Sequence, residues 1–75
     1  MEFTKEIDAR GMSCPLPILK TNRALNDLAS GEVLKIVATD PGSVKDMQAF
    51  SNLTGHLLLA STEENRAFVF FLRKK

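Results

Sequence analysis

Apolar and polar positions alternate with changing period along the first half of the chain, which predicts strand, helix and strand in turn. Residues 3–9 alternate as in a half-buried strand, with Phe3, Ile7 and Ala9 on one face, although Lys5 interrupts the pattern. Residues 15–28 have helical spacing, with an apolar stripe of Ile18, Leu25 and Leu28 and with Leu19 and Ala29 at its margin. Residues 33–39 are mostly β-branched and apolar, which is typical of a central strand. Ser30-Gly31 predicts a left-handed glycine cap at the end of the first helix.

The second half repeats the alternation and then ends in two strands. Val44, Met47 and Phe50 form the apolar stripe of a second helix, which closes at Gly55. Residues 56–61 and 66–73 predict two strands joined by the polar loop 62–65, as in an antiparallel hairpin.

The start of the second helix has two possible caps. In one, Asp40 is the N-cap and Pro41 occupies the first helical position. In the other, Ser43 is the N-cap and Asp46 follows three residues later, as in a capping box. The sequence leaves both arrangements open.

The order β-α-β-α-β-β predicts a two-layer α/β sandwich with a four-stranded mixed sheet and both helices on one face. We expect one domain over residues 1–75, because the chain has too little apolar material for a second core. The uncovered sheet face would carry Val33, Val37, Val69 and Phe71 or their alternates. That face is either an association surface or the ordinary apolar remainder of a small domain. A monomer or a weak dimer is therefore expected.

Composition and charge argue against a nucleic-acid-binding, membrane-bound or zinc-binding protein. The chain is 44% hydrophobic and 25% charged with a net charge of +1, which provides no strong attraction to nucleic acid or anionic membranes. No segment has the length expected of a signal peptide or a membrane helix. The single cysteine and single histidine exclude an internal disulfide and a zinc site built by this chain alone. These features predict a cytoplasmic protein without a bound metal or cofactor.

Cys14 is the candidate for chemistry, because two alternating prolines follow it at the predicted start of a helix. Proline suits the first helical position and keeps the preceding residue out of the α region. We therefore expect Cys14 to be the N-cap, Pro15 the first helical residue and Pro17 part of the first turn.

That arrangement predicts an activated thiol. Pro15 and Pro17 lack amide hydrogens, so the amides of Leu16 and Ile18 would be the two free donors near a sulfur anion. With the helix dipole, they predict a modest lowering of the Cys14 pKa. The neighbouring cations Arg10, Lys20 and Arg23 are candidates to add to this effect and to dock a partner.

Other interpretations compete at each of these positions. A lone cysteine is also a common buried packing residue, although packing alone does not require two prolines. Asp40 is favoured as a helix or turn cap, and Asp46 either stabilises a helix start or recognises a partner. His56 begins a predicted strand, and nothing in the sequence links it to Cys14.

Taken together, these motifs resemble the TusA family of sulfur carriers, also called SirA-like, over essentially the whole chain. The residues that carry the resemblance are Ile7-Asp8-Ala9, Gly11, Cys14-Pro15-Leu16-Pro17, Gly31-Glu32, Ala38-Thr39-Asp40-Pro41, Asp46 and Gly55-His56.

The resemblance implies a β-α-β-α-β-β sandwich whose cysteine, here Cys14, carries sulfane sulfur as a persulfide. The sulfur would come from a cysteine desulfurase or a rhodanese-like sulfurtransferase and pass to an acceptor protein. Family members serve tRNA thiolation, molybdenum-cofactor sulfuration, dissimilatory sulfur oxidation or thiosulfate uptake. The resemblance links Asp46 to partner docking and implies a carrier rather than a stand-alone enzyme. The alternative is a regulatory or nucleic-acid-binding module of similar fold.

Overall fold

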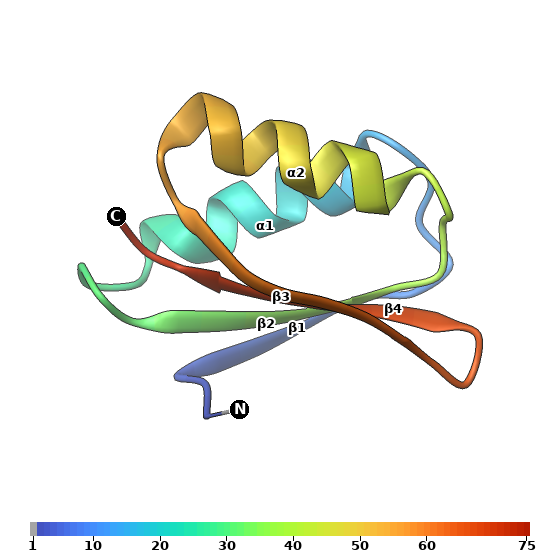
Figure 1. The fold of residues 1–75 in the computed structure, drawn as a ribbon, viewed down its shortest axis with the longest axis horizontal. Helices are drawn as coiled ribbons and strands as arrows, with labels where there is room; N and C mark the ends of the chain where they lie inside the picture. The colour runs from blue at the N-terminus through green and yellow to red at the C-terminus, as the bar shows by residue number, and fades with distance from the viewer. Residues whose placement is uncertain (1) are drawn as a thin grey trace.

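The computed structural model describes residues 2–75 and shows a layer of two helices over a sheet of four strands (Figure 1). The elements follow the predicted order and are β1 (Lys5–Ala9), α1 (Leu16–Asn26), β2 (Val33–Ala38), α2 (Ser43–Thr54), β3 (Leu57–Glu64) and β4 (Ala67–Arg73). The predicted fold class is confirmed. None of the helices in the described part of the chain is long and apolar enough to cross a membrane.

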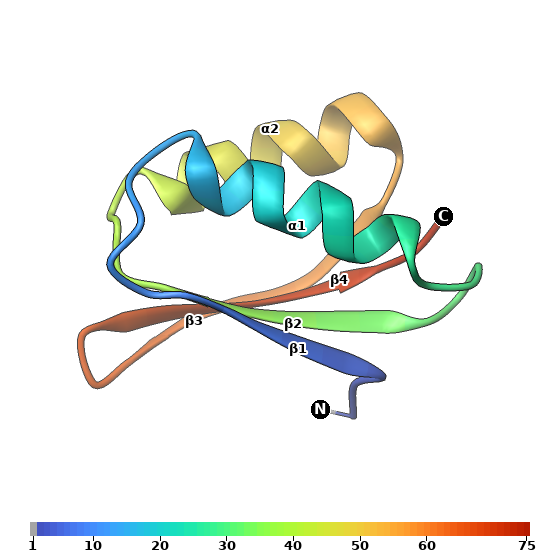
Figure 2. The same cartoon turned by 180° about the vertical axis from the view of Figure 1, so that it is seen from behind.

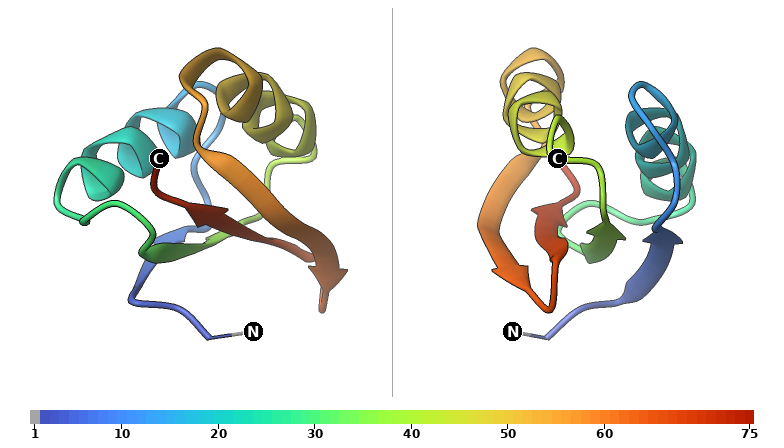
Figure 3. Two further views of the ribbon diagram at one scale, coloured as in Figure 1. Left: turned by 60° about the vertical axis from the view of Figure 1, so that its left-hand side comes forward. Right: turned by 90° about the vertical axis from the view of Figure 1, so that its right-hand side faces the viewer.

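The strands lie in the order β1-β2-β4-β3, with β1 parallel to β2 and the other neighbours antiparallel. Both helices cover the same face of this mixed sheet, and they lie side by side above it (Figures 2 and 3). Because β1 and β2 are parallel neighbours, the loops that follow them leave the sheet at the same edge. Each of these loops leads into the start of a helix.

The core fills the space between the helices and the sheet. Leu34 and Ile36 of β2 and Phe70 of β4 are fully buried against Leu25 and Met47 of the two helices. Two positions of the predicted apolar stripes are more exposed than a core position would be. Leu19, placed at the margin of the first stripe, is 59% exposed, and Val44 of the second stripe is 38% exposed. Pro17, Thr21, Ala24 and Leu25 are the buried residues of α1.

The ends of α1 differ from the prediction at both sides. The helix begins at Leu16 and ends at Asn26, with Asp27 as its C-cap in the ordinary α conformation. Gly31 does have a positive φ of 88°, but it lies in the loop before β2 and donates its N–H to the Lys74 carbonyl. Gly31 therefore shapes the loop that leads into β2 and does not cap α1.

Neither predicted cap of α2 forms. The helix begins at Ser43 with Gly42 as its N-cap, and no side chain caps it. At the other end, Gly55 adopts the left-handed conformation with φ of 84°, as predicted.

The hairpin turn is tighter than the predicted four-residue loop. Asn65 and Arg66 both have positive φ, of 50° and 66°, as in a two-residue type I′ turn. This turn matches the twist of the strands, so β3 continues to Glu64 and pairs with Ala67. Residues 62–64, expected in a loop, thus belong to β3.

The face of the sheet away from the helices carries Val33, Val37, Val69 and Phe71, as predicted, because their strand neighbours form the core. Phe3 precedes β1 and packs against Phe71, with ring centroids 6.3 Å apart. The Lys35 ammonium lies 5.2 Å from the centroid of the Phe3 ring. Phe3 was predicted to share a face with Ile7. Its position outside β1 lets it cover the open face instead.

Candidate functional site

Cys14 is exposed on the loop between β1 and α1, and its backbone is held by the loop that follows β2. The Cys14 N–H donates to Oδ2 of Asp40 at 2.9 Å, and the Gly42 N–H donates to Oδ1 of the same carboxylate at 3.2 Å. The Asp40 carbonyl also accepts hydrogen bonds from the backbone N–H and the hydroxyl of Ser43. One residue thus joins the cysteine loop to the start of α2.

A second contact fixes the same loop closer to the sheet. The Gly11 N–H donates to the Thr39 hydroxyl at 2.9 Å, and the Met12 N–H donates to the Ala9 carbonyl at 3.3 Å. Gly11 has φ of 80°, a conformation that glycine adopts at little cost. Thr39 and Asp40 therefore hold the loop at two points and fix the backbone that carries the thiol.

The predicted role of Cys14 as helix N-cap is wrong. Pro15 is the N-cap, and the Cys14–Pro15 peptide bond is cis. The Leu16 N–H donates to the Ser13 carbonyl at 2.9 Å, and the Ile18 N–H donates to the Pro15 carbonyl at 3.1 Å. The chain is already turning before α1 begins, so the two amides expected to face the sulfur are used within the loop and the first turn. Pro17 lies in the first turn of α1, as predicted, and is buried.

The predicted lowering of the thiol pKa is also wrong in direction. The carboxylate of Asp46 raises the pKa of Cys14, because a protonated thiol can donate to it and a thiolate is repelled by it. Desolvation of the thiol and the negative charge of Asp40 raise the pKa further. The sequence placed three cations close to Cys14 along the chain, whereas the fold brings two carboxylates to it.

Arg10, one of the three cations expected to act on Cys14, is paired with Asp8 instead. Its guanidinium donates from Nε to Oδ1 of Asp8 at 2.9 Å and from Nη2 to Oδ2 at 3.1 Å. These contacts lower the pKa of Asp8 to about 2 and raise that of Arg10. Lys20 donates to the Asp8 carbonyl at 2.6 Å.

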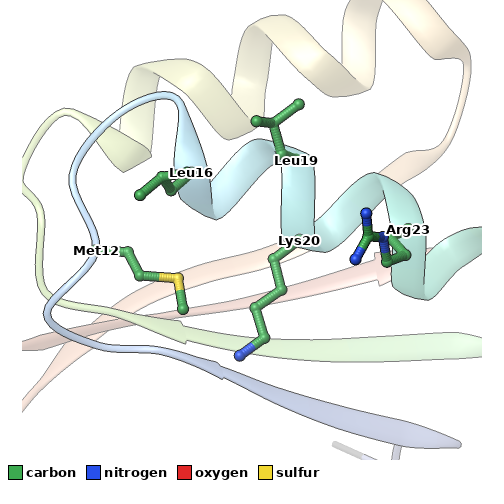
Figure 4. Close-up of a pocket in the computed structure, with 5 residues that line it drawn as sticks. All are labelled: Met12, Leu16, Leu19, Lys20 and Arg23. Carbon is green, nitrogen blue, oxygen red and sulfur yellow. The ribbon is translucent and has the colours of Figure 1, made fainter.

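The structure places Lys20 and Arg23 together on α1, where they line a hollow with three apolar side chains (Figure 4). The lining residues are Met12, Leu16, Leu19, Lys20 and Arg23, and we call this hollow the α1 groove. Leu16 was predicted only as an amide donor, but its side chain is 49% exposed in this groove. Sequence reasoning missed the groove because it treated Leu19 as marginal to the buried stripe.

Asp46 occupies the first turn of α2 and is half-buried. The position fits the predicted stabilising role, since a carboxylate in the first turn is favourable to the helix dipole. The carboxylate also faces the thiol, and its role in recognising a partner stays a prediction. The carboxylate of Asp40 was favoured as a cap, and its contact with the Cys14 amide could not be read from the sequence. The Asp-Pro-Gly turn directly after a strand marked the position of Asp40 but not its partner 26 residues away.

His56 lies at the other end of α2 from the cysteine. Its ring stacks on Phe50 with centroids 5.8 Å apart, and its Nδ1 accepts the Lys75 N–H at 3.1 Å. Desolvation and then the charges of Lys74 and Lys75 lower its pKa. Since α2 has 12 residues and is about 18 Å long at about 1.5 Å per residue, His56 is not a base for Cys14. Residues 2–75 contain no cluster of three or more side chains suited to a metal ion.

Comparison with known proteins gives a consistent result over the whole chain. A family model described as sulfurtransferase TusA matches residues 5–74. A protein of Allochromatium vinosum named sulfur carrier protein TusA is 51% identical over 73 residues, covering 97% of this chain and 96% of its own. The putative sulfur carrier protein YrkI of Bacillus subtilis is 42% identical, and 99% of each chain is covered.

A solved structure has the same fold. The SirA-like protein of Desulfitobacterium hafniense superposes with a TM-score of 0.84 at 24% identity, covering 93% of this chain and 96% of its own. The motif around Cys14, the fold and the extent of these matches together show that the chain belongs to the TusA family.

Proposed function

We propose that this protein is a sulfur carrier in which Cys14 holds sulfane sulfur as a persulfide between a donor protein and an acceptor protein. The observation that carries the proposal is the single thiol, exposed on a loop whose backbone is fixed by Asp40. An exposed thiol can meet the sulfur of another protein, and a fixed backbone presents it in a constant position. The names of the relatives support the same role.

The transfer balances without an external oxidant. Cys14 attacks the outer sulfur of the donor persulfide, a new S–S bond forms at Cys14, and the S–S bond of the donor breaks. The donor leaves as a thiol, with the proton that Cys14 gave up. The reverse exchange with an acceptor thiol returns the carrier to its starting state.

The chain is suited to relay rather than to an internal redox cycle. Cys14 is its only cysteine, so no resolving thiol within the chain can displace the bound sulfur as a disulfide. We infer that a cysteine desulfurase or a rhodanese-type sulfurtransferase supplies the sulfur. An acceptor in tRNA thiolation, molybdenum-cofactor formation or sulfur oxidation would receive it.

Intact-mass spectrometry tests the proposal directly. The protein is incubated with a desulfurase and cysteine, or with a rhodanese-type sulfurtransferase and thiosulfate. We expect the mass of the wild-type chain to increase by one sulfur atom, and a thiol reductant to remove it. Cys14→Ser is the matched control and should gain nothing. An unmodified wild type, or equal modification of Cys14→Ser, would contradict the proposal.

The alternative of a nucleic-acid-binding module makes a different prediction. Salt-dependent RNA or DNA binding that Cys14→Ala leaves unchanged would favour it. Of the five phenylalanines, Phe70 is fully buried and Phe50 nearly so, so neither offers a ring for base stacking.

A further inference from the structure

The α1 groove exposes apolar side chains directly beside the reactive loop. Leu16, two residues after Cys14, is 49% exposed, and Leu19 is 59% exposed. Met12, on the other side of Cys14 in sequence, lines the same hollow (Figure 4). Leucines held in solvent at this place contribute little to the core, so their exposure favours a role in contact with another molecule.

The polar edge of the α1 groove is cationic. Lys20 and Arg23 line it, and no acidic side chain does. Within residues 2–75, the ion pairs join Lys5 to Asp27, Arg10 to Asp8 and Lys35 to Glu6, so neither groove cation forms an ion pair, although the charge of Lys20 helps to lower the pKa of Asp8. Lys20 contacts only a backbone carbonyl, that of Asp8. The groove therefore offers an apolar floor and two charges available to an anionic group.

We propose that the α1 groove is the docking site for an acidic, apolar segment of the protein that donates sulfur to Cys14. The proposal rests on the carrier function proposed above. Its basis is complementarity: apolar side chains of the donor would cover Leu16 and Leu19, and carboxylates would meet Lys20 and Arg23. A second copy of this chain would fit poorly, because an isologous contact brings the same two cations together.

Two donors of sulfur separate docking from chemistry. A protein donor, the desulfurase or rhodanese-type enzyme that loads the wild type, must dock before transfer. Glutathione persulfide reaches Cys14 without docking. The test variant is the double charge reversal Lys20→Glu/Arg23→Glu. The matched control, Arg66→Glu/Arg73→Glu, makes the same charge change at two exposed positions, one in the turn before β4 and one at the end of that strand.

We expect the test variant to lose about tenfold or more in kcat/KM with the protein donor, since close interfacial charge pairs are worth at least that factor. Its rate with glutathione persulfide should stay within about twofold of wild type, and circular dichroism should show an unchanged fold. Equal rates for the test variant and the control with the protein donor would overturn the docking proposal. If the wild type takes no sulfur from either donor, the carrier function itself fails.

A photocrosslinker identifies what occupies the groove. Benzoylphenylalanine replaces Leu19 in one variant and Leu53 of α2, which is 86% exposed, in the control. Each variant is irradiated with the donor, and the linked peptide is sequenced by mass spectrometry. We expect linkage from position 19 to a segment with carboxylates beside apolar residues. Linkage to a basic segment, or no more linkage than from position 53, would contradict the proposal.

Discussion

The two flanks of Cys14 differ in charge and in origin. On the α2 side, Asp40 and Asp46 surround the thiol with negative charge and raise its pKa. On the α1 side, Lys20 and Arg23 edge an apolar groove. A sulfur site with opposite charges on its two sides accepts a partner in one orientation and disfavours the reversed one.

The two flanks also differ in how far their residues lie from Cys14 along the chain. The residues of the α1 groove lie within nine positions of Cys14, whereas the Asp40 carboxylate that contacts the Cys14 amide is 26 positions away. The first flank depends on the local helix, and the second exists only once β1 and β2 have paired. Substitutions of Asp40 and Asp46, which we call the acidic flank, should therefore alter stability and thiol chemistry, whereas substitutions in the α1 groove should alter docking of a donor.

The largest effect on the acidic flank is expected from Asp40→Ala. It removes acceptors for the Cys14 and Gly42 amides, which should lower the free energy of unfolding by about 1–2 kcal/mol. Urea unfolding measures this, and amide exchange at Cys14 should become faster. Asp40→Asn keeps one carbonyl acceptor and should lose less. Equal stability of Asp40→Ala and wild type would show that the loop is held by other contacts.

A chemical effect without a large change in stability is expected from Asp46→Asn. A neutral amide no longer repels the thiolate, so the pKa of Cys14 should fall and more thiolate should be present at neutral pH. Iodoacetamide should then alkylate Cys14 faster, and the midpoint of its pH–rate profile should move to lower pH. Glu63→Gln, a charge change on β3, serves as control. A profile that stays in place, or moves upward, would contradict the role given to Asp46.

The smallest effect is expected from Asp8→Asn, which lies outside both flanks but holds Arg10 and accepts Lys20 through its carbonyl. The folded pKa of about 2 lies below the ordinary value of 3.8, so this carboxylate stabilises the fold above about pH 4. Its contribution disappears as the pH falls from about 4 to about 2. Urea unfolding should therefore show a slightly smaller acid-induced loss for Asp8→Asn than for wild type. An identical pH dependence would indicate that the pair with Arg10 contributes nothing.

The pattern of the sequence was sufficient for the order of elements, the two-layer arrangement and the open sheet face. Periodicity and turn residues are local properties, so they could also place Gly55 at the end of α2 and β2 in the centre of the sheet. The N-caps of both helices were predicted wrongly, because several residues near Cys14 and Asp40 offer equivalent donors and acceptors. In the structure these groups make contacts across the chain instead, such as that of the Cys14 N–H with the Asp40 carboxylate.

The sequence by itself identified the candidate reactive atom, because Cys14 is the only thiol and two prolines mark its loop. Only the tertiary structure decided the electrostatic environment of that thiol. Basic residues are its neighbours along the chain, but charge acts through space, and parallel pairing of β1 with β2 brings Asp40 and Asp46 to it instead. Of the three neighbouring cations, Arg10 pairs with Asp8, whereas Lys20 and Arg23 line the groove on α1, where we propose that they meet the sulfur donor.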